Sequence, residues 1–199
     1  FPPGKKDPVL AGTVLENMLN AHVETYHLLK AIPGSEKVKI GLVKNIFQFD
    51  PLRRWHLLDW AFSKILNDVY TNAPLEFLKT GKSSFYMPGM VNNEMLNQKA
   101  PGTLDFIGLN YYSRMHVKGR LNPKEPFVFD TREQDIMTDM GYPLYAEGFY
   151  RALKTISEVD VPIYVTENGL ADDKDTVRPL FIERYLYALN MALKERINI

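Results

Sequence analysis

Short apolar, strand-like runs alternate along this chain with longer segments of helical periodicity, and this order restricts the fold more than any other feature of the sequence. Strands are predicted at residues 38–45, 104–112 and 161–167, and helices at 8–32, 57–70, 74–80, 146–159 and 177–196. Strands and helices that follow one another in this way form parallel β/α units. The chain is therefore predicted to be an α/β protein.

Two architectures accommodate such units, an open doubly wound sheet and a closed barrel. Three strands cannot close a barrel, which needs eight and typically takes about 250 residues. The chain has 199 residues. No Gly-x-Gly-x-x-Gly or Walker-type loop follows any predicted strand, so a nucleotide-binding fold has no support.

The segments between these units are predicted to be long connections. Residues 83–103 carry the turn signals Pro88-Gly89 and Pro101-Gly102, and such a stretch is interpreted as a loop. Residues 113–143 form the second connection. We expect a small hairpin within it, and its apolar positions are Met115, Val117, Phe127 and Phe129.

The helix at 8–32 has a clear start and one apolar stripe. Asp7 can cap its free amide groups, and Pro8 suits the first helical position. The stripe consists of Leu10, Val14, Met18, Ala21, Leu28 and Leu29. Such spacing is typical of an amphipathic helix.

Composition excludes several classes of function. Lys plus Arg and Asp plus Glu each number 24, so the formal net charge is zero and a basic nucleic-acid binder is not expected. The absence of cysteine excludes disulfides and thiolate catalysis, and it fits a reducing, cytoplasmic location. No apolar run is long enough to span a bilayer, so no membrane partner is expected. Because the sequence does not begin with Met, we expect a processed product or a piece of a longer chain.

Glu167 is the first candidate for a functional residue. It ends the apolar run Val-Pro-Ile-Tyr-Val at 161–165, and the turn signal Asn168-Gly169 follows it. In parallel α/β folds the carboxyl ends of the strands collect catalytic groups. An ionised carboxylate at the end of a buried strand is costly to keep without a partner. Glu167 is therefore the predicted catalytic centre.

The preceding strand ends in a similar way, at Asn110, Tyr111 and Tyr112. Parallel pairing would bring both strand ends to one edge, where a tyrosine hydroxyl can donate to Glu167 and keep it ionised. Strand alternation turns the two tyrosines to opposite faces. The alternative is that both simply pack between strand and helices.

No metal or cofactor is expected. His22 and His27 are five residues apart and do not share a helix face. The acidic loop 172–175 does not have the spacing of a twelve-residue calcium loop, and a solvated surface is the preferred interpretation.

Four segments together resemble glycoside hydrolase family 1. They are residues 165–169 (Val-Thr-Glu-Asn-Gly), 106–113 (Phe-Ile-Gly-Leu-Asn-Tyr-Tyr-Ser), 140–150 (Met-Gly-Tyr-Pro-Leu-Tyr-Ala-Glu-Gly-Phe-Tyr) and the opening Phe-Pro-Pro-Gly at 1–4. The resemblance covers essentially the whole chain. It implies a (β/α)8 TIM barrel, of which this chain supplies about strands 5–7 and helices 4–7. Residues 1–199 would then be a partial catalytic domain without its N-terminal and C-terminal parts.

The resemblance also implies an activity, retaining hydrolysis of β-D-glycosides of the β-glucosidase type. Glu167 would be the nucleophile, Tyr112 would orient it, and Asn110 would lie beside the 2-hydroxyl of the sugar. The substrate would be a small-molecule or oligosaccharide β-glycoside.

The family's acid/base glutamate lies in a Thr-x-Asn-Glu-Pro motif, and no Asn-Glu-Pro occurs in these residues. The nearest match, Asn93-Glu94-Met95, is predicted to lie in a loop. We therefore expect the isolated chain to be inactive and to aggregate unless the remainder of the barrel, from unseen sequence or another chain, completes it. The alternative function is a non-catalytic, klotho-type binding protein for a carbohydrate or another partner.

Overall fold

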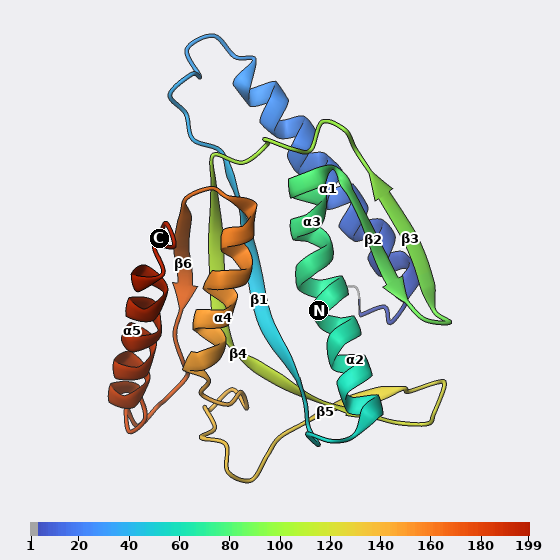
Figure 1. Ribbon diagram of the computed structural model, residues 1–199, viewed down its shortest axis with the longest axis vertical. Coiled ribbons are helices and arrows are strands. Elements are labelled where there is room, and N and C mark those ends of the chain that lie inside the picture. Colours follow the sequence, from blue (N-terminus) through green and yellow to red (C-terminus); the bar gives the residue numbers. More distant parts are fainter. Residues whose placement is uncertain (1–3) are drawn as a thin grey trace. The chain divides into compact units, whose positions relative to one another are not determined.

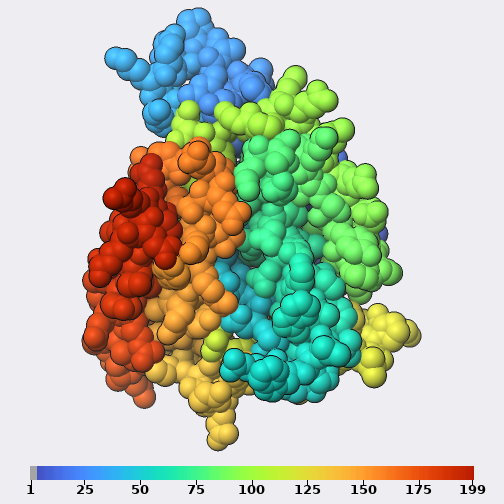
Figure 2. All heavy atoms as spheres, in the orientation of Figure 1, coloured from blue at the N-terminus to red at the C-terminus, as the bar shows by residue number. Residues whose placement is uncertain are grey.

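The computed structural model describes residues 4–199, which fall into two compact units. The first unit comprises residues 4–42 and 68–105, and the second comprises 43–67 and 106–199. Figure 1 shows helices and strands in both, and Figure 2 shows the packing of their side chains. None of the helices in the described part of the chain combines the length and the hydropathy that a bilayer span requires.

The second unit is built on a four-stranded sheet with β4 (Phe106–Gly119) at its centre. β1 (Gly41–Pro51) is a neighbour of β4, and β6 (Ile163–Asn168) pairs with β4 in parallel. β5 (Phe127–Asp130) pairs with the far end of β4 antiparallel, with Val117 opposite Phe129. The parallel pair and the small hairpin predicted from the sequence are both confirmed.

Two helices cover one face of this sheet, α4 (Ala146–Ile156) and α5 (Arg178–Lys194), and they lie side by side. A 3₁₀ turn, Ser157–Val159, extends α4 to the predicted end. Buried residues from β4 face these helices: Ile107, Leu109 and Tyr111. Fully burying such side chains contributes about 1.5–3 kcal/mol each.

Aromatic rings hold the sheet and the two helices together. The Tyr111 ring lies 5.7 Å from that of Phe149 and 6.2 Å from that of Tyr185, and Phe181 lies 4.2 Å from Tyr185. A Cβ atom added at Gly148 would stand 2.0 Å from the Tyr111 hydroxyl oxygen. Only glycine therefore allows α4 to approach β4 this closely.

The opposite side of the sheet is called the open face here. Strand alternation places Phe106, Gly108, Asn110 and Tyr112 of β4 on it. A Cβ atom at Gly108 would meet Val43 of β1 and Thr166 of β6, which shows that both neighbours contribute to this face. Its polar end is formed by the carboxyl ends of β4 and β6.

The second unit also contains α2 (Leu57–Asn67), which is anchored by a buried carboxylate. Asp59 is fully buried and pairs with Arg53, at 2.7 Å between Oδ1 and the guanidinium. Its oxygens also accept from the backbone amides of Arg53 and Gly119. These bonds tie the start of α2 to the far end of β4, and they hold the pKa of Asp59 far below its usual value despite burial.

The first unit contains α1 (Pro8–Lys30), a short π-helix (Asp68–Asn72), α3 (Ala73–Thr80) and a hairpin of β2 (Lys82–Met87) and β3 (Val91–Leu96). Asp7 caps α1 as predicted, with Oδ1 accepting from the amides of Val9 and Leu10. α3 ends at Gly81, whose φ of 75° is the left-handed conformation that favours glycine.

Three predictions about these elements were wrong. Residues 83–103 are not an irregular loop but contain the β2–β3 hairpin, in which Phe85, Met87, Val91 and Met95 are buried. The strand predicted at 38–45 instead spans Gly41–Pro51, so the segment after Phe47 continues it. Asn93-Glu94-Met95 accordingly lies in β3 and not in a loop.

The predicted apolar stripe of α1 is mostly exposed. Val14 is 46% exposed, Met18 is 66% exposed and Leu28 is 69% exposed, whereas the helix buries Leu19 and Val23. α1 carries apolar residues on more than one side, and periodicity alone does not decide which side packs within this chain. The resemblance at the opening Phe-Pro-Pro-Gly falls mainly on residues 1–3, which lie outside the described residues.

Candidate functional site at the ends of β4 and β6

The carboxyl ends of β4 and β6 bring all three predicted site residues together. Asn110 lies opposite Glu167 in the parallel register, and Tyr111 lies opposite Asn168. Leu109 pairs with Val165, so β6 contains one extra residue, Thr166, at this point. The pair therefore has a β-bulge at the start of the site.

The bulge decides which face carries Glu167. Side chains that are opposite one another in a sheet point to the same side. In an unbroken register Glu167 would be opposite Tyr111 and would point toward the helices. The extra residue places it opposite Asn110 and beside Tyr112, on the open face. Both Thr166 and Glu167 consequently lie on that face.

Tyr112 fixes the Glu167 carboxylate. Its hydroxyl donates a hydrogen bond of 2.6 Å to Oε2 of Glu167. This bond is the largest cause of the raised pKa of Tyr112, because ionising the phenol would forfeit it and place two anions side by side. Tyr112 therefore remains a donor, and one carboxylate oxygen has a fixed direction.

The backbone of Tyr112 is held from the other side of the sheet. The Tyr185 hydroxyl of α5 donates to the carbonyl oxygen of Tyr112 at 2.9 Å. Tyr111 points toward the helices and donates to the carbonyl oxygen of Tyr145 at 2.9 Å. Burial raises the pKa of both Tyr111 and Tyr185, so both phenols stay protonated.

Asn110 is oriented by the bulge residue. The Thr166 hydroxyl donates to Oδ1 of Asn110 at 2.6 Å. Within residues 4–199 no side-chain hydrogen bond uses the amide nitrogen of Asn110, which leaves it as a donor on the open face. Nδ2 of Asn168 donates to the carbonyl oxygen of Tyr111 and fixes the strand end.

These groups form an oriented, exposed carboxylate with an amide donor next to it. Such an arrangement can supply a nucleophile or a base. Retaining glycoside hydrolysis would need a second carboxyl group about 5–5.5 Å away. Glu94, the nearest sequence match to the missing motif, belongs to the other unit.

The remaining candidates have structural partners. Nε2 of His22 lies 2.8 Å from the carbonyl oxygen of Thr103, and Nε2 of His27 lies 3.1 Å from that of Lys99. Oδ2 of Asp172 accepts from the amides of Val177 and Arg178 at the start of α5. Among the residues that the structure describes, no group of three metal-ligating side chains occurs.

Sequence reasoning did not single out Thr166 and Tyr185. Thr166 belongs to the strand-end motif, but its role depends on the bulge, which no sequence signal announced. Tyr185 lies within the helix predicted at 177–196, and its hydroxyl contact joins residues 73 apart in the chain.

Similarity to known proteins extends over nearly the whole chain. The family model of glycosyl hydrolase family 1 matches residues 1–199. A β-galactosidase of Pyrococcus woesei is 26% identical over 98% of this chain and 42% of its own length. β-Glucosidase A of Thermotoga maritima is 30% identical over 86% of this chain and 40% of its own length. The chain thus spans about two fifths of these relatives.

Solved structures show the same relationship. The β-glycosidase from Pyrococcus horikoshii superimposes with a TM-score of 0.82 at 30% identity, over 100% of this chain and 44% of that one. A β-glucosidase from Exiguobacterium marinum gives 0.81 at 21% identity, over 100% and 48% respectively. The second likeness concerns the fold alone. The family model and these relatives show that the chain belongs to glycosyl hydrolase family 1.

Proposed function

We propose that this chain is the nucleophile-bearing segment of a retaining β-glycosidase. Residues 1–199 would form part of a (β/α)8 barrel, with β1, β4 and β6 as about strands 5–7. Of the barrel's helices, helix 4 would be α1, helix 5 would be α2 together with α3, helix 6 would be α4 and helix 7 would be α5. The hydrogen bond between Tyr112 and Glu167 carries the proposal, because it holds a carboxylate at a strand end in a defined direction.

The reaction would proceed in two displacements. In the first, Glu167 attacks the anomeric carbon of a β-D-glycoside, a carboxylate–carbon bond forms, and the bond to the leaving oxygen breaks. Because Oε2 accepts from Tyr112, Oε1 would be the attacking oxygen. In the second, water displaces the carboxylate and configuration is retained.

Asn110 would recognise the sugar. Its amide nitrogen faces the same side as Glu167, and a donor there can bind the 2-hydroxyl. Hydrogen bonds at this hydroxyl strengthen in the transition state of retaining enzymes. The proton donor for the leaving group would come from the remainder of the barrel, since no Asn-Glu-Pro occurs among the 199 residues.

Covalent trapping tests the nucleophile separately from the acid/base group. A 2,4-dinitrophenyl 2-deoxy-2-fluoro-β-glycoside has a leaving group that departs without protonation, so labelling does not need the acid. We expect the complete protein, treated with the glucoside and galactoside forms, to yield a peptide modified at Glu167. Glu167→Gln should remove the label, whereas Glu94→Gln should retain it.

A folded complete protein that carries no label at Glu167 with either reagent would contradict the proposal. That outcome would favour the non-catalytic, klotho-type binding protein. The residue at the Asn-Glu-Pro position of the complete protein separates the same alternatives, because a retaining enzyme needs a carboxyl group there.

A further inference from the structure

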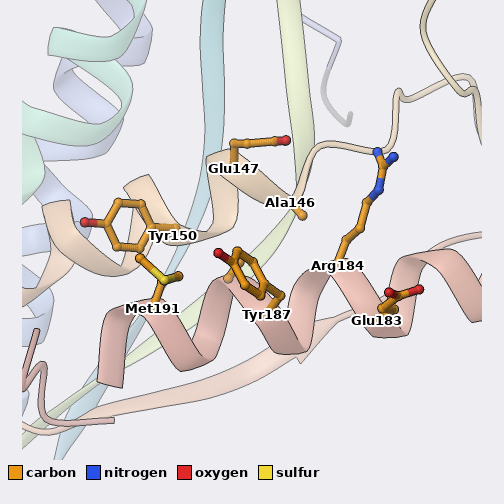
Figure 3. A pocket seen from close by; sticks show the side chains of 8 residues that line it. Ala146, Glu147, Tyr150, Glu183, Arg184, Tyr187 and Met191 are labelled. Atoms are coloured by element: carbon orange, nitrogen blue, oxygen red, sulfur yellow. The ribbon is translucent and has the colours of Figure 1, made fainter. Parts of the chain in front are cut away.

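A groove separates the outward sides of α4 and α5, on the surface visible in Figure 2. Its volume is about 610 Å³, within the range of small-molecule sites. Figure 3 shows Tyr150 projecting into it from α4, and Tyr187 and Met191 from α5. Buried Ala146 and Ala188 form its floor because they are too small to fill it.

The groove places aromatic surface in contact with solvent. Tyr187 is 66% exposed, although the next residue of α5, Ala188, is 5% exposed. The Tyr150 hydroxyl is held by Glu195, which also binds Lys154 at 3.1 Å, so this ring has a fixed position. Two tyrosine rings and a thioether thus offer apolar surface that the rest of residues 4–199 leaves in contact with solvent.

Three charged side chains border this apolar surface, Glu147 on α4 and Glu183 and Arg184 on α5. Within residues 4–199 none of the three has a side-chain hydrogen bond or an ion pair. The border therefore presents acceptors that cannot donate and donors that cannot accept. A ligand that satisfies both must carry groups that donate at one point and accept at another.

These features favour one chemical class. An anion would meet two carboxylates, and a cation would meet the Arg184 guanidinium. A neutral polyhydroxylated ring avoids both conflicts, because each hydroxyl can donate to a carboxylate or accept from a guanidinium. The all-equatorial ring of a β-glucoside also has a flat face of C–H groups that can lie against a tyrosine ring.

We propose that this groove binds the pyranose ring of a neutral glycoside or oligosaccharide, on the helical side of the sheet and away from Glu167. Glu167 lies on the open face, whereas α4 and α5 cover the other face. The groove would hold a saccharide without reaction, since the proposed nucleophile Glu167 is on the other face of the sheet.

Methionine-methyl NMR of the complete protein tests this directly, because Met191 lies in the groove and the chain's other seven methionines serve as internal references. With ¹³C-methyl-methionine labelling and Met191→Leu for assignment, titration with cellotetraose should shift the Met191 signal saturably. The shift should persist in a Glu167→Gln background. Tyr187→Ala should weaken this binding roughly ten-fold or more, whereas Tyr86→Ala, at a tyrosine that is 52% exposed in β2, should not.

The proposal is overturned by any of three results. Met191 does not shift at saturating cellotetraose, or its shift disappears in the Glu167→Gln background, or Tyr187→Ala leaves the affinity unchanged. Trapping at Glu167 by the fluoro-glycoside should proceed at the same rate in Tyr187→Ala, which keeps this test independent of the nucleophile assignment.

Discussion

Tyr111 and Tyr112 are adjacent in β4, yet their hydroxyl groups bind on opposite sides of the sheet. Tyr111 donates to the carbonyl oxygen of Tyr145 among the helices, and Tyr112 donates to Glu167 on the open face. One tyrosine therefore connects strand and helix, and the other connects two strand ends. Substitutions at the two positions should have effects that separate cleanly.

Replacement of Tyr112 by Phe should mainly affect activity. It removes a hydrogen bond to a charged group, which is worth roughly 1.5–3 kcal/mol. In the complete protein we expect kcat/KM for an aryl β-glycoside to fall roughly 10- to 100-fold, with a change of under about 1 kcal/mol in unfolding free energy. Tyr86→Phe is the matched control. An unchanged kcat/KM would contradict the assigned role of Tyr112.

Replacement of Tyr111 by Phe should mainly affect stability. It leaves the half-buried carbonyl oxygen of Tyr145 without the Tyr111 donor, which costs roughly 1–3 kcal/mol of unfolding free energy. Denaturant unfolding of the complete protein measures this. kcat/KM should stay within about two-fold of the parent value, because the Tyr112–Glu167 bond is untouched. A large fall in kcat/KM with little change in unfolding free energy would contradict this separation of effects.

Gly148→Ala should destabilise the protein even though alanine favours helices. Helix propensity alone would predict a gain of about 0.5–1 kcal/mol. The added Cβ atom, however, would stand 2.0 Å from the Tyr111 hydroxyl oxygen, and such overpacking typically costs roughly 1–3 kcal/mol. Gly169→Ala is the control, since nothing lies within 4 Å of its Cβ position. Equal melting temperatures for the two variants would show that α4 can shift away.

Asp59 should make stability depend on acidity. Its pKa is lowered in the folded state, so its contribution is present above the ordinary carboxyl pKa and is lost as pH falls below about 4. Asp59→Ala should lower the unfolding free energy at pH 7 by roughly 2–4 kcal/mol. The difference between parent and variant should shrink as pH falls from 5 to 2. A constant difference over that range would contradict the linkage.

The 199-residue chain expressed alone should aggregate or remain partly unfolded. Val43 is 50% exposed and Tyr164 is 57% exposed on the open face, and both lie in strands beside β4. Exposed apolar sheet surface of this kind promotes association between chains. Sedimentation and thermal unfolding measure the outcome. A soluble monomer with one cooperative transition would show that the chain is self-sufficient.

The parallel arrangement of β4 and β6 could be predicted from the sequence because it depends on local patterns. Apolar runs located β4 and β6, the polar end of β6 indicated Glu167, and the family resemblance selected Asn110 and Tyr112. The family resemblance rested on four segments, of which the two strand ends are residues 106–113 and 165–169. The assignment of barrel strands 5–7 and the catalytic roles remain predictions.

Other features depend on contacts that are not local. The β2–β3 hairpin was missed although Pro88-Gly89 is a turn signal, because Ser83, Ser84, Asn92 and Asn93 dilute the apolar alternation in both strands. The burial of Leu19 and Val23 in place of the Val14–Met18 stripe depends on which neighbours α1 has. Periodicity identifies a helix with apolar sides, but it does not choose among them.

The bulge at Thr166 makes the direction of the Glu167 side chain depend on strand register, which side-chain chemistry does not reveal. If β6 paired with β4 in one continuous register through Thr166, Glu167 would be opposite Tyr111 and would point toward the helices, with every site residue still present in the sequence. Removing Thr166 would instead take away the bulge and leave Glu167 opposite Asn110. The pairing partner of Glu167, and not the length of β6, therefore decides whether its carboxylate lies on the open face.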